Sequence, residues 1–150
     1  MKRHMETTRS TIRMATADDS AEIAALLGEL GYPADEAFVR TRLQSLLSSR
    51  EDAVFVAEWD GELAGFLSFH LIPLFHTQGR LGRITALSVS GKFQRRGVGK
   101  AMISAAEALA WENDCERIEV TSGDARSEAH AFYRGVGYQE VSRRFMKSKS

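Results

Sequence analysis

Residues 87–100 read Leu87-Ser88-Val89-Ser90-Gly91-Lys92-Phe93-Gln94-Arg95-Arg96-Gly97-Val98-Gly99-Lys100. The beginning of this stretch suits the end of a strand, and its last residues open a long helix. N–H groups at a helix start lack partners within the helix, and the helix dipole favours negative charge there. Gly97 and Gly99 have no side chains that would keep phosphates away from the backbone. Arg95, Arg96 and Lys100 add positive charge. The stretch therefore predicts a diphosphate site.

The stretch differs from two common phosphate-binding motifs. The pattern G-x-G-x-x-G requires a glycine at the position of Met102. The pattern G-x-x-x-x-G-K-[ST] requires one where Gln94 stands. The predicted turn also follows three successive strands, whereas the first motif follows the first strand of a βαβ unit. Neither a dinucleotide fold nor a P-loop is therefore expected.

The rest of the chain alternates between helical and strand periodicity. Asp18 is placed to cap the first helix, and Asp60-Gly61 predicts a hairpin. We expect helices over residues 18–30, 35–49, 97–113 and 127–135, and strands over residues 11–14, 53–59, 62–74, 81–90, 118–122 and 138–147. The order β-α-α-β-β-β-α-β-α-β predicts an α/β (α+β) fold, with a mixed, mostly antiparallel sheet and helices on both faces.

Composition limits the classes of function. A chain of 150 residues with 43% hydrophobic content suits one domain, which we place at residues 11–150 after a flexible tail of residues 1–10. The formal net charge is zero, which argues against nucleic-acid and anionic-membrane partners. No apolar run is long enough for a membrane span. Cys115 is the one cysteine, so no internal disulfide is expected, and a reducing, cytoplasmic location fits.

Two motifs resemble those of a known family. The pattern Q-x-x-G-x-G after a long strand is similar to the coenzyme A loop of the GNAT superfamily of N-acetyltransferases. A second pattern, typical of the last helix and strand of that family, reads Glu128-Ala129-His130-Ala131-Phe132-Tyr133, then Gly135-Val136-Gly137-Tyr138. The resemblance runs from residue 12 to about residue 147. It implies a GNAT fold and the use of acetyl-CoA as co-substrate.

The resemblance also implies roles for individual residues. Leu87, Ser88 and Val89 would offer backbone groups to the pantetheine arm and the thioester, including an oxyanion-hole donor. Tyr133 would donate a proton to the departing sulfur. Arg126 stands where the family often has an asparagine that touches the cofactor, which puts that contact in doubt. The predicted diphosphate loop comprises Gln94, Arg95, Arg96, Gly97, Val98, Gly99 and Lys100.

The general base is left open by the sequence. An alkylammonium group must lose a proton before it can attack. His70 shares a strand face with Ser68, and Glu119 shares one with Thr121, so either could serve as the base. Each has an ordinary alternative, a hydrogen-bonded strand histidine or a surface acid. Loop and helix histidines are weaker candidates: His76 lies in a predicted loop, and His130 is interpreted as structural or as a neighbour of the cofactor.

Within the family, the strand Gly65-Phe66-Leu67-Ser68-Phe69-His70-Leu71 and the ending Arg144-Phe145-Met146-Lys147 are similar to the aminoalkylphosphonate acetyltransferases. Acids associated with the fourth strand of those enzymes are replaced here by Arg83 and Ala86. We therefore expect neither a metal nor a phosphonate substrate. Arg80 and Arg83 could instead meet an acidic group on the substrate, or lie solvated at the rim.

The function expected from these features is acetyl transfer from acetyl-CoA to a primary amine of a small molecule, by direct attack in a ternary complex. A covalent acetyl-enzyme is not expected, because Cys115 lies outside both motifs. Alternatives are a protein lysine or N-terminal acetyltransferase and a non-catalytic acyl-CoA-binding module. The resemblance also suggests a homodimer.

Overall fold

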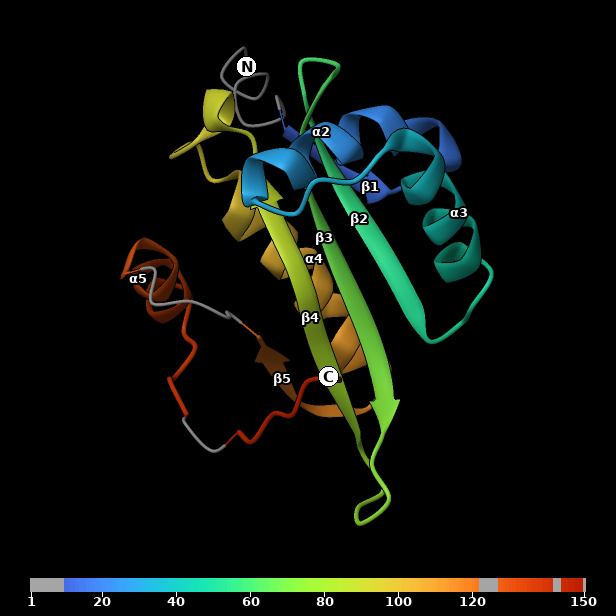
Figure 1. The fold of residues 1–150 in the computed structure, drawn as a ribbon. Helices are drawn as coiled ribbons and strands as arrows, with labels where there is room; N and C mark the ends of the chain where they lie inside the picture. The colour runs from blue at the N-terminus through green and yellow to red at the C-terminus, as the bar shows by residue number, and fades with distance from the viewer. Residues whose placement is uncertain (1–9, 122–126, 142–143, 150) are drawn as a thin grey trace.

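The computed structural model describes residues 10–121, 127–141 and 144–149. Figure 1 shows a central sheet with helices on both of its faces. The elements in chain order are β1 (Ser10–Met14), η1 (Ala17–Asp19), α2 (Ser20–Leu30), α3 (Glu36–Leu47), β2 (Asp52–Trp59), β3 (Glu62–Pro73), β4 (Arg80–Val89), η2 (Gly91–Phe93), α4 (Val98–Glu112), β5 (Cys115–Val120) and α5 (Ser127–Gly135). The α/β class and the helices on both faces are as predicted.

The sheet has the strand order β1-β2-β3-β4-β5. Its first four strands are antiparallel neighbours, and β5 runs parallel to β4 after the α4 crossover. The β2–β3 hairpin turns at Asp60 and Gly61, both with positive φ, as the Asp-Gly signal predicts. The mixed, mostly antiparallel sheet is therefore confirmed.

Each face of the sheet buries its own apolar layer. On one face, which we call the α4 face, Leu67, Phe69 and Ile84 pack with Met102 and Ile103 of α4. On the other, the α2/α3 face, Val54, Val56 and Phe66 pack against α2 and α3. Because alternate strand residues point to opposite faces, both layers follow from the strand periodicity. Helices α2 and α3 lie over one end of the α2/α3 face (Figure 1).

Strand β4 separates from β5 halfway along its length. The ladder between them ends at Ile84 opposite Val120, whereas β4 continues to Val89. The β3–β4 register skips Thr85 at the same point, because Phe69 pairs with Ile84 and Ser68 with Ala86. Such a bulge bends a strand and re-aims its side chains. Among the described residues, the second half of β4 therefore has no strand neighbour on the β5 side.

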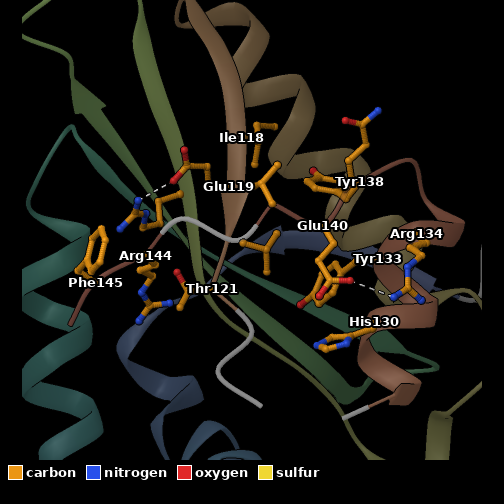
Figure 2. Close-up of a pocket in the computed structure, with 14 residues that line it drawn as sticks. Ile118, Glu119, Thr121, His130, Tyr133, Arg134, Tyr138, Glu140, Arg144 and Phe145 are labelled. Carbon is orange, nitrogen blue, oxygen red and sulfur yellow. Dashed lines mark hydrogen bonds and ion pairs between the residues drawn. The ribbon is translucent and has the colours of Figure 1, made fainter. Parts of the chain in front are cut away.

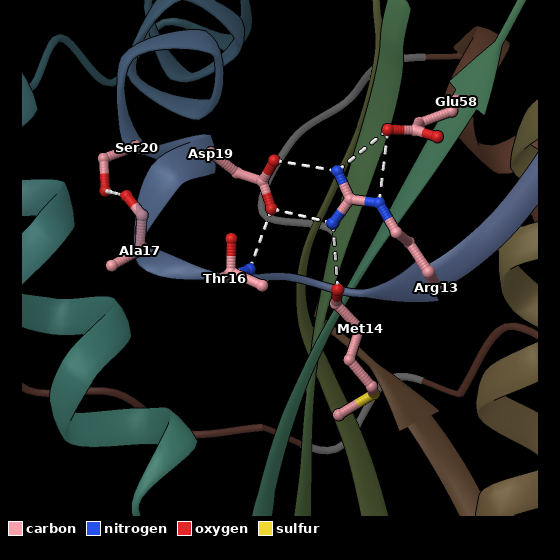
Figure 3. A network of polar contacts seen from close by, with 7 residues as sticks. All are labelled: Arg13, Met14, Thr16, Ala17, Asp19, Ser20 and Glu58. Carbon is pink, nitrogen blue, oxygen red and sulfur yellow. Dashed lines mark hydrogen bonds and ion pairs between the residues drawn. The ribbon is translucent and has the colours of Figure 1, made fainter. Parts of the chain in front are cut away.

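A polar network joins η1 to strands β1 and β2 (Figure 3). The Arg13 guanidinium on β1 donates two hydrogen bonds of 2.9 Å to Asp19 and also bonds Glu58 on β2. Asp19 in turn accepts from the Thr16 N–H at 2.8 Å. Bonding to Arg13 lowers the pKa of Asp19 despite its burial. The cap residues are Thr16 and Asp19, so the prediction that Asp18 caps the first helix is wrong.

The expected final strand over residues 138–147 does not form: residues 138–141 and 144–149 have no regular structure. Helix α5 closes with the Tyr138 N–H bonded to the Tyr133 carbonyl at 2.9 Å, and Gly137 has a φ of 101°. Beyond it, Val141 and Phe145 are 80% and 99% exposed. A hollow separates this segment from β5. A segment whose sequence is typical of a strand does not form one unless it pairs with a neighbouring strand.

Candidate functional site

The turn between β4 and α4 is shaped by its backbone. Ser90 caps the short helix η2, with its hydroxyl accepting from the Lys92 N–H at 3.3 Å. Phe93 is buried and anchors the turn to the α4 face. Arg95 and Gly97 then adopt left-handed conformations, with φ of 64° and 81°. These two reversals direct the chain into α4 at Val98.

The start of α4 presents free main-chain donors. Gly97 is the N-cap residue and has no side chain that could cap the helix. The Ala101 N–H bonds the Gly97 carbonyl at 3.0 Å, so the N–H groups of Val98, Gly99 and Lys100 precede the first intrahelical bond. With the helix dipole, this geometry binds anions.

A hollow of about 380 Å³ opens in front of these donors. We call it the turn hollow. Its walls come from the C-terminal end of α2, the half of β4 beyond the β4–β5 ladder, the turn and α5. It is lined by Glu29, Leu30, Leu87, Ser88, Val89, Gly91, Phe93, Gln94, Arg95, Gly97, Val98, Gly99, Lys100, Glu128, Ala129, Phe132 and Tyr133. The structure thus brings together all the residues predicted to bind the cofactor except Arg96 and Arg126.

Arg96 and Arg126 are missing from this lining for different reasons. The Arg96 guanidinium lies over the rings of Trp59 and Phe93, 5.4 and 5.7 Å from their centroids. Its charge is therefore used in cation–π contacts, and Arg96 is not among the residues that line the hollow. Arg126 lies outside the described residues. Neighbouring sequence positions in a turn with two left-handed residues need not face the same way.

The two glycines of the motif serve different purposes. Gly97 needs its left-handed φ, and a Cβ there would meet no protein atom within 4 Å. Gly99 has an ordinary backbone, but a Cβ there would lie 3.1 Å from Cζ of Phe132 on α5. Gly99 therefore lets α5 pack against the start of α4. On the sequence alone, Gly99 is explained by the access of phosphate to the backbone. The structure adds this packing role.

Gln94 braces the turn. Its Nε2 donates to the Val89 carbonyl at 2.9 Å, which joins the end of β4 to the residue before the first left-handed position. Glu29 of α2 accepts from the Gly91 N–H at 3.2 Å on the opposite side. These two hydrogen bonds fix the turn from opposite sides.

A second hollow of about 690 Å³ lies between β5 and the segment after α5 (Figure 2). We call it the β5 hollow. It is lined by Arg83, Ile118, Glu119, Val120, Thr121, His130, Tyr133, Arg134, Tyr138, Gln139, Glu140, Val141, Arg144 and Phe145. His130 therefore lies beside this hollow, consistent with a position near the site. Within the described residues, no three His, Cys, Asp or Glu side chains gather as metal ligands would.

Tyr133 lines both hollows. Its ring makes edge contacts with Phe132 and Tyr138, at centroid distances of 5.3 and 6.2 Å. Burial raises the pKa of its phenol, so the hydroxyl stays protonated at neutral pH. The phenol is thus neutral and has a proton to donate.

The two candidate bases lie in different electrostatic surroundings. Glu119 bonds Arg83 at 2.7 Å and Arg117 at 2.9 Å. Those bonds, first of all the one from Arg117, lower the pKa of Glu119, which makes it a poor proton acceptor. Nδ1 of His70 lies 2.7 Å from Asp52 Oδ1, and its Nε2 lies 2.8 Å from Thr85 Oγ1. The histidine therefore keeps a nitrogen that can accept a proton.

Asp52 and Thr85 were not expected from the sequence. The register of the β2–β3 hairpin places Asp52 opposite His70 only because a bulge skips Ala64, whereas an unbroken count from the Asp60-Gly61 turn would have paired Asp52 with Phe69. Thr85 reaches His70 through the bulge in β4, for which the sequence carries no clear signal. Glu29 and Leu30 of α2 also line the turn hollow, because α2 packs over that end of the sheet.

Comparison with known proteins identifies the family of the chain. The sequence profile of the acetyltransferase (GNAT) family matches residues 20–138. An aminoglycoside N(6')-acetyltransferase type 1 of Stenotrophomonas maltophilia is 31% identical over 137 residues, 89% of this chain and 88% of that protein. An aminoalkylphosphonate N-acetyltransferase of Salmonella typhimurium is 28% identical over 143 residues, 91% of this chain and 90% of that protein.

A solved structure shares the fold. An aminoglycoside N-acetyltransferase in complex with CoA superposes with a TM-score of 0.83 at 17% identity, covering 93% of this chain and 94% of that one. The resemblance inferred from the two motifs is therefore confirmed, including the likeness to an aminoalkylphosphonate acetyltransferase. On the strength of the profile match and of the relative at 31% identity, the chain belongs to the acetyltransferase (GNAT) family of enzymes.

Proposed function

We propose that this enzyme transfers an acetyl group from acetyl-CoA to a primary amine of a small molecule, by direct attack in a ternary complex. The observation that carries the proposal is that Tyr133 lines two hollows at once. One hollow has free helix donors at its end, as a diphosphate requires. The other is mixed in polarity, as an amine-bearing acceptor requires.

The turn hollow fits coenzyme A in its chemistry. The N–H groups of Val98, Gly99 and Lys100 would hold the diphosphate, with Arg95 and Lys100 adding charge. The half of β4 that no longer pairs with β5, residues 85–89, would offer its main-chain groups on that side to the pantetheine arm. When bound, acetyl-CoA supplies the activated thioester. The relative solved with CoA supports this choice of co-substrate.

Tyr133 is proposed as the general acid. Its raised pKa keeps a proton available for the sulfur as the C–S bond breaks. A thiolate is a weaker base than a phenolate, so the hydrogen bond from Tyr133 would strengthen as charge develops on the sulfur, before the proton is transferred. The position of the side chain at the junction of the hollows supports this role.

His70 is proposed as the general base in preference to Glu119. The bonds from Arg83 and Arg117 hold Glu119 in its charged form, whereas His70 has a polar partner on each ring nitrogen. Arg83 is itself occupied by Glu119, which argues against its use as an anchor for a phosphonate. The relatives act on aminoglycosides and aminoalkylphosphonates, and the amine is what these substrates share.

Direct transfer is favoured by the state of the one cysteine. Cys115 begins β5, is buried among the residues of the α4 face, and has a pKa raised by that burial. A buried thiol that keeps its proton is a poor nucleophile. The cysteine also suits the cytoplasmic location expected from the sequence. That location and the homodimer stay predictions, the second to be tested by light scattering.

The experiment is acetyl-CoA turnover across a panel of amines, including aminoglycosides, aminoalkylphosphonates and a lysine peptide. Free thiol release and the mass of the acetylated product are both measured. We expect thiol release to depend on a small-molecule amine. Acetylation of the peptide alone would indicate a protein acetyltransferase. Tight binding of acetyl-CoA without turnover of any amine would indicate a binding module, and absence of binding would contradict the proposal altogether.

A further inference from the structure

Three polar side chains from three neighbouring strands meet on the α2/α3 face. Asp52 begins β2, His70 lies opposite it on β3, and Thr85 comes from β4. The Asp52 Oδ1 to His70 Nδ1 distance is 2.7 Å, and the His70 Nε2 to Thr85 Oγ1 distance is 2.8 Å. Both are short for hydrogen bonds of these types. The three groups form one continuous hydrogen-bonded chain.

We propose that this chain is a proton relay, in which Thr85 receives the proton of the attacking amine, His70 takes it up and Asp52 positions His70. The inference rests on the proposed function, because it supplies that reaction with its base. It adds an exposed residue, Thr85, as the group that would meet the amine, and a positioning residue, Asp52.

The partners of the imidazole determine the direction of the relay. A carboxylate only accepts hydrogen bonds, so Nδ1 of His70 carries the proton and donates it to Asp52. Nε2 then has a lone pair and accepts from a hydroxyl. Two hydroxyls are in range, Thr85 at 2.8 Å and Ser68 at 3.2 Å, and the shorter contact belongs to Thr85. A hydroxyl that donates to Nε2 keeps its own lone pairs for an incoming N–H.

The bulge in β4 brings Thr85 to this place. Thr85 is the residue that the β3–β4 register skips, and the β4–β5 ladder ends at the residue before it. Bulges re-aim side chains and recur next to active sites. The side chain of Thr85 is exposed, whereas His70 is only 21% exposed. Thr85 is therefore the accessible end of the relay, at the point where β4 no longer pairs with β5.

Charged groups reach His70 from both neighbouring strands. Asp52 of β2 adds a negative charge on the Nδ1 side. Arg83 of β4 lies opposite His70 in the register, and its guanidinium is paired with Glu119 of β5 at 2.7 Å. The Arg83 charge is thus balanced by its own partner. Arg83 also lines the β5 hollow, so the relay adjoins the proposed acceptor side, although neither His70 nor Thr85 lines it.

The proton transfers balance as follows. The acceptor ammonium loses one proton to the Thr85 oxygen while the Thr85 hydroxyl proton passes to Nε2. His70, then an imidazolium against Asp52, releases that proton to solvent. Tyr133 gives its phenol proton to the sulfur as the C–S bond breaks. It recovers a proton from the nitrogen that has formed the new N–C bond. One amine proton thus ends on the thiol and one in solvent.

The kinetic test uses matched variants at one position. Thr85→Val keeps the shape and removes the hydroxyl, and we expect kcat to fall about 100-fold while the KM for acetyl-CoA changes less than about twofold. Thr85→Ser restores the hydroxyl and should recover kcat to within about threefold. Ser68→Ala removes the more distant hydroxyl and should cost less than about threefold. Asp52→Asn should lower kcat about 100-fold, because an amide no longer fixes the tautomer.

A second readout does not depend on turnover. The long-range ¹H–¹⁵N spectrum of the histidine rings, with His70→Gln to identify the signals, should show His70 protonated at Nδ1 in the free protein. Asp52→Asn should convert it to a mixture of tautomers, and Thr85→Val should move the Nε2 signal. A His70 ring protonated at Nε2 would overturn the relay.

The outcomes separate the relay from the function on which it rests. A wild-type protein that acetylates no amine overturns both. A wild-type rate that Thr85→Val leaves intact overturns the relay alone. An acetyl group found on Thr85 by intact-mass analysis during turnover would also overturn it, because Thr85 would then be a nucleophile.

Discussion

The turn hollow and the β5 hollow differ in what builds them. The turn hollow depends on backbone: a left-handed glycine, a helix start and the part of β4 that no longer pairs with β5. The β5 hollow depends on side chains from β4, β5, α5 and the segment that follows. A site made of main-chain donors tolerates many sequences as long as its glycines remain. A site made of side chains is set by the acceptor it serves.

The two candidate bases provide the largest expected effect. His70→Gln should lower kcat about 1,000-fold, because the proton acceptor is lost. Glu119→Gln should change kcat less than about threefold, since that carboxylate is held in ion pairs by Arg83 and Arg117. Steady-state rates with the best amine of the panel measure both. The reverse ranking would move the base to β5.

Tyr133, where the two hollows meet, provides the next effect. Tyr133→Phe should lower kcat about 100-fold and leave the Kd of CoA within about twofold. Burial raises the pKa of Tyr133, so an acid role is lost only as pH rises above the usual tyrosine value of about 10. The wild-type pH profile should therefore show no alkaline loss below that value. An unchanged rate in the variant would exclude the acid role.

A pair of glycines tests the backbone nature of the turn hollow. Gly97 and Gly61 have φ of 81° and 84°, and a Cβ at either would meet nothing within 4 Å. Gly97→Ala and Gly61→Ala should each cost about 1 kcal/mol in the free energy of unfolding. Gly97→Ala alone should raise the Kd of CoA about tenfold, which corresponds to about 1.4 kcal/mol. Urea unfolding and calorimetry measure the two quantities, and equal affinities would contradict the proposed diphosphate position.

Two adjacent arginines give the smallest effect. Arg95→Ala should raise the Kd of CoA about threefold, because a cation at the rim of the turn hollow is lost. Arg96→Ala should leave the Kd unchanged and lower stability by about 1 kcal/mol, because its contacts with Trp59 and Phe93 are lost. Titration calorimetry and thermal unfolding distinguish them. A loss of affinity in Arg96→Ala would place its side chain at the ligand.

The contrast between a hollow built from backbone and one built from side chains also explains what the sequence could predict. Periodicity and turn signals predict the helices and four of the first five strands closely. The loop motif and the family resemblance predict most residues of the turn hollow, but not Glu29 and Leu30 of α2. Cys115 starts β5 three residues before the predicted start at residue 118, since parallel pairing with β4 begins at Arg80. Packing between segments that are distant in the sequence sets the orientation of Arg96, the position of Tyr133 beside both hollows and the partners of His70. The prediction of a strand over residues 138–147 was wrong, because the sequence pattern of a segment does not show whether a neighbouring strand pairs with it.

The free donors at the head of α4 are tested most directly by the ¹H–¹⁵N spectrum of labelled protein titrated with CoA. The account predicts that the amides of Val98, Gly99 and Lys100 shift most and saturate together, and that pantetheine without the diphosphate leaves them in place. Failure to bind CoA, or saturable shifts confined to residues of the β5 hollow, would contradict it.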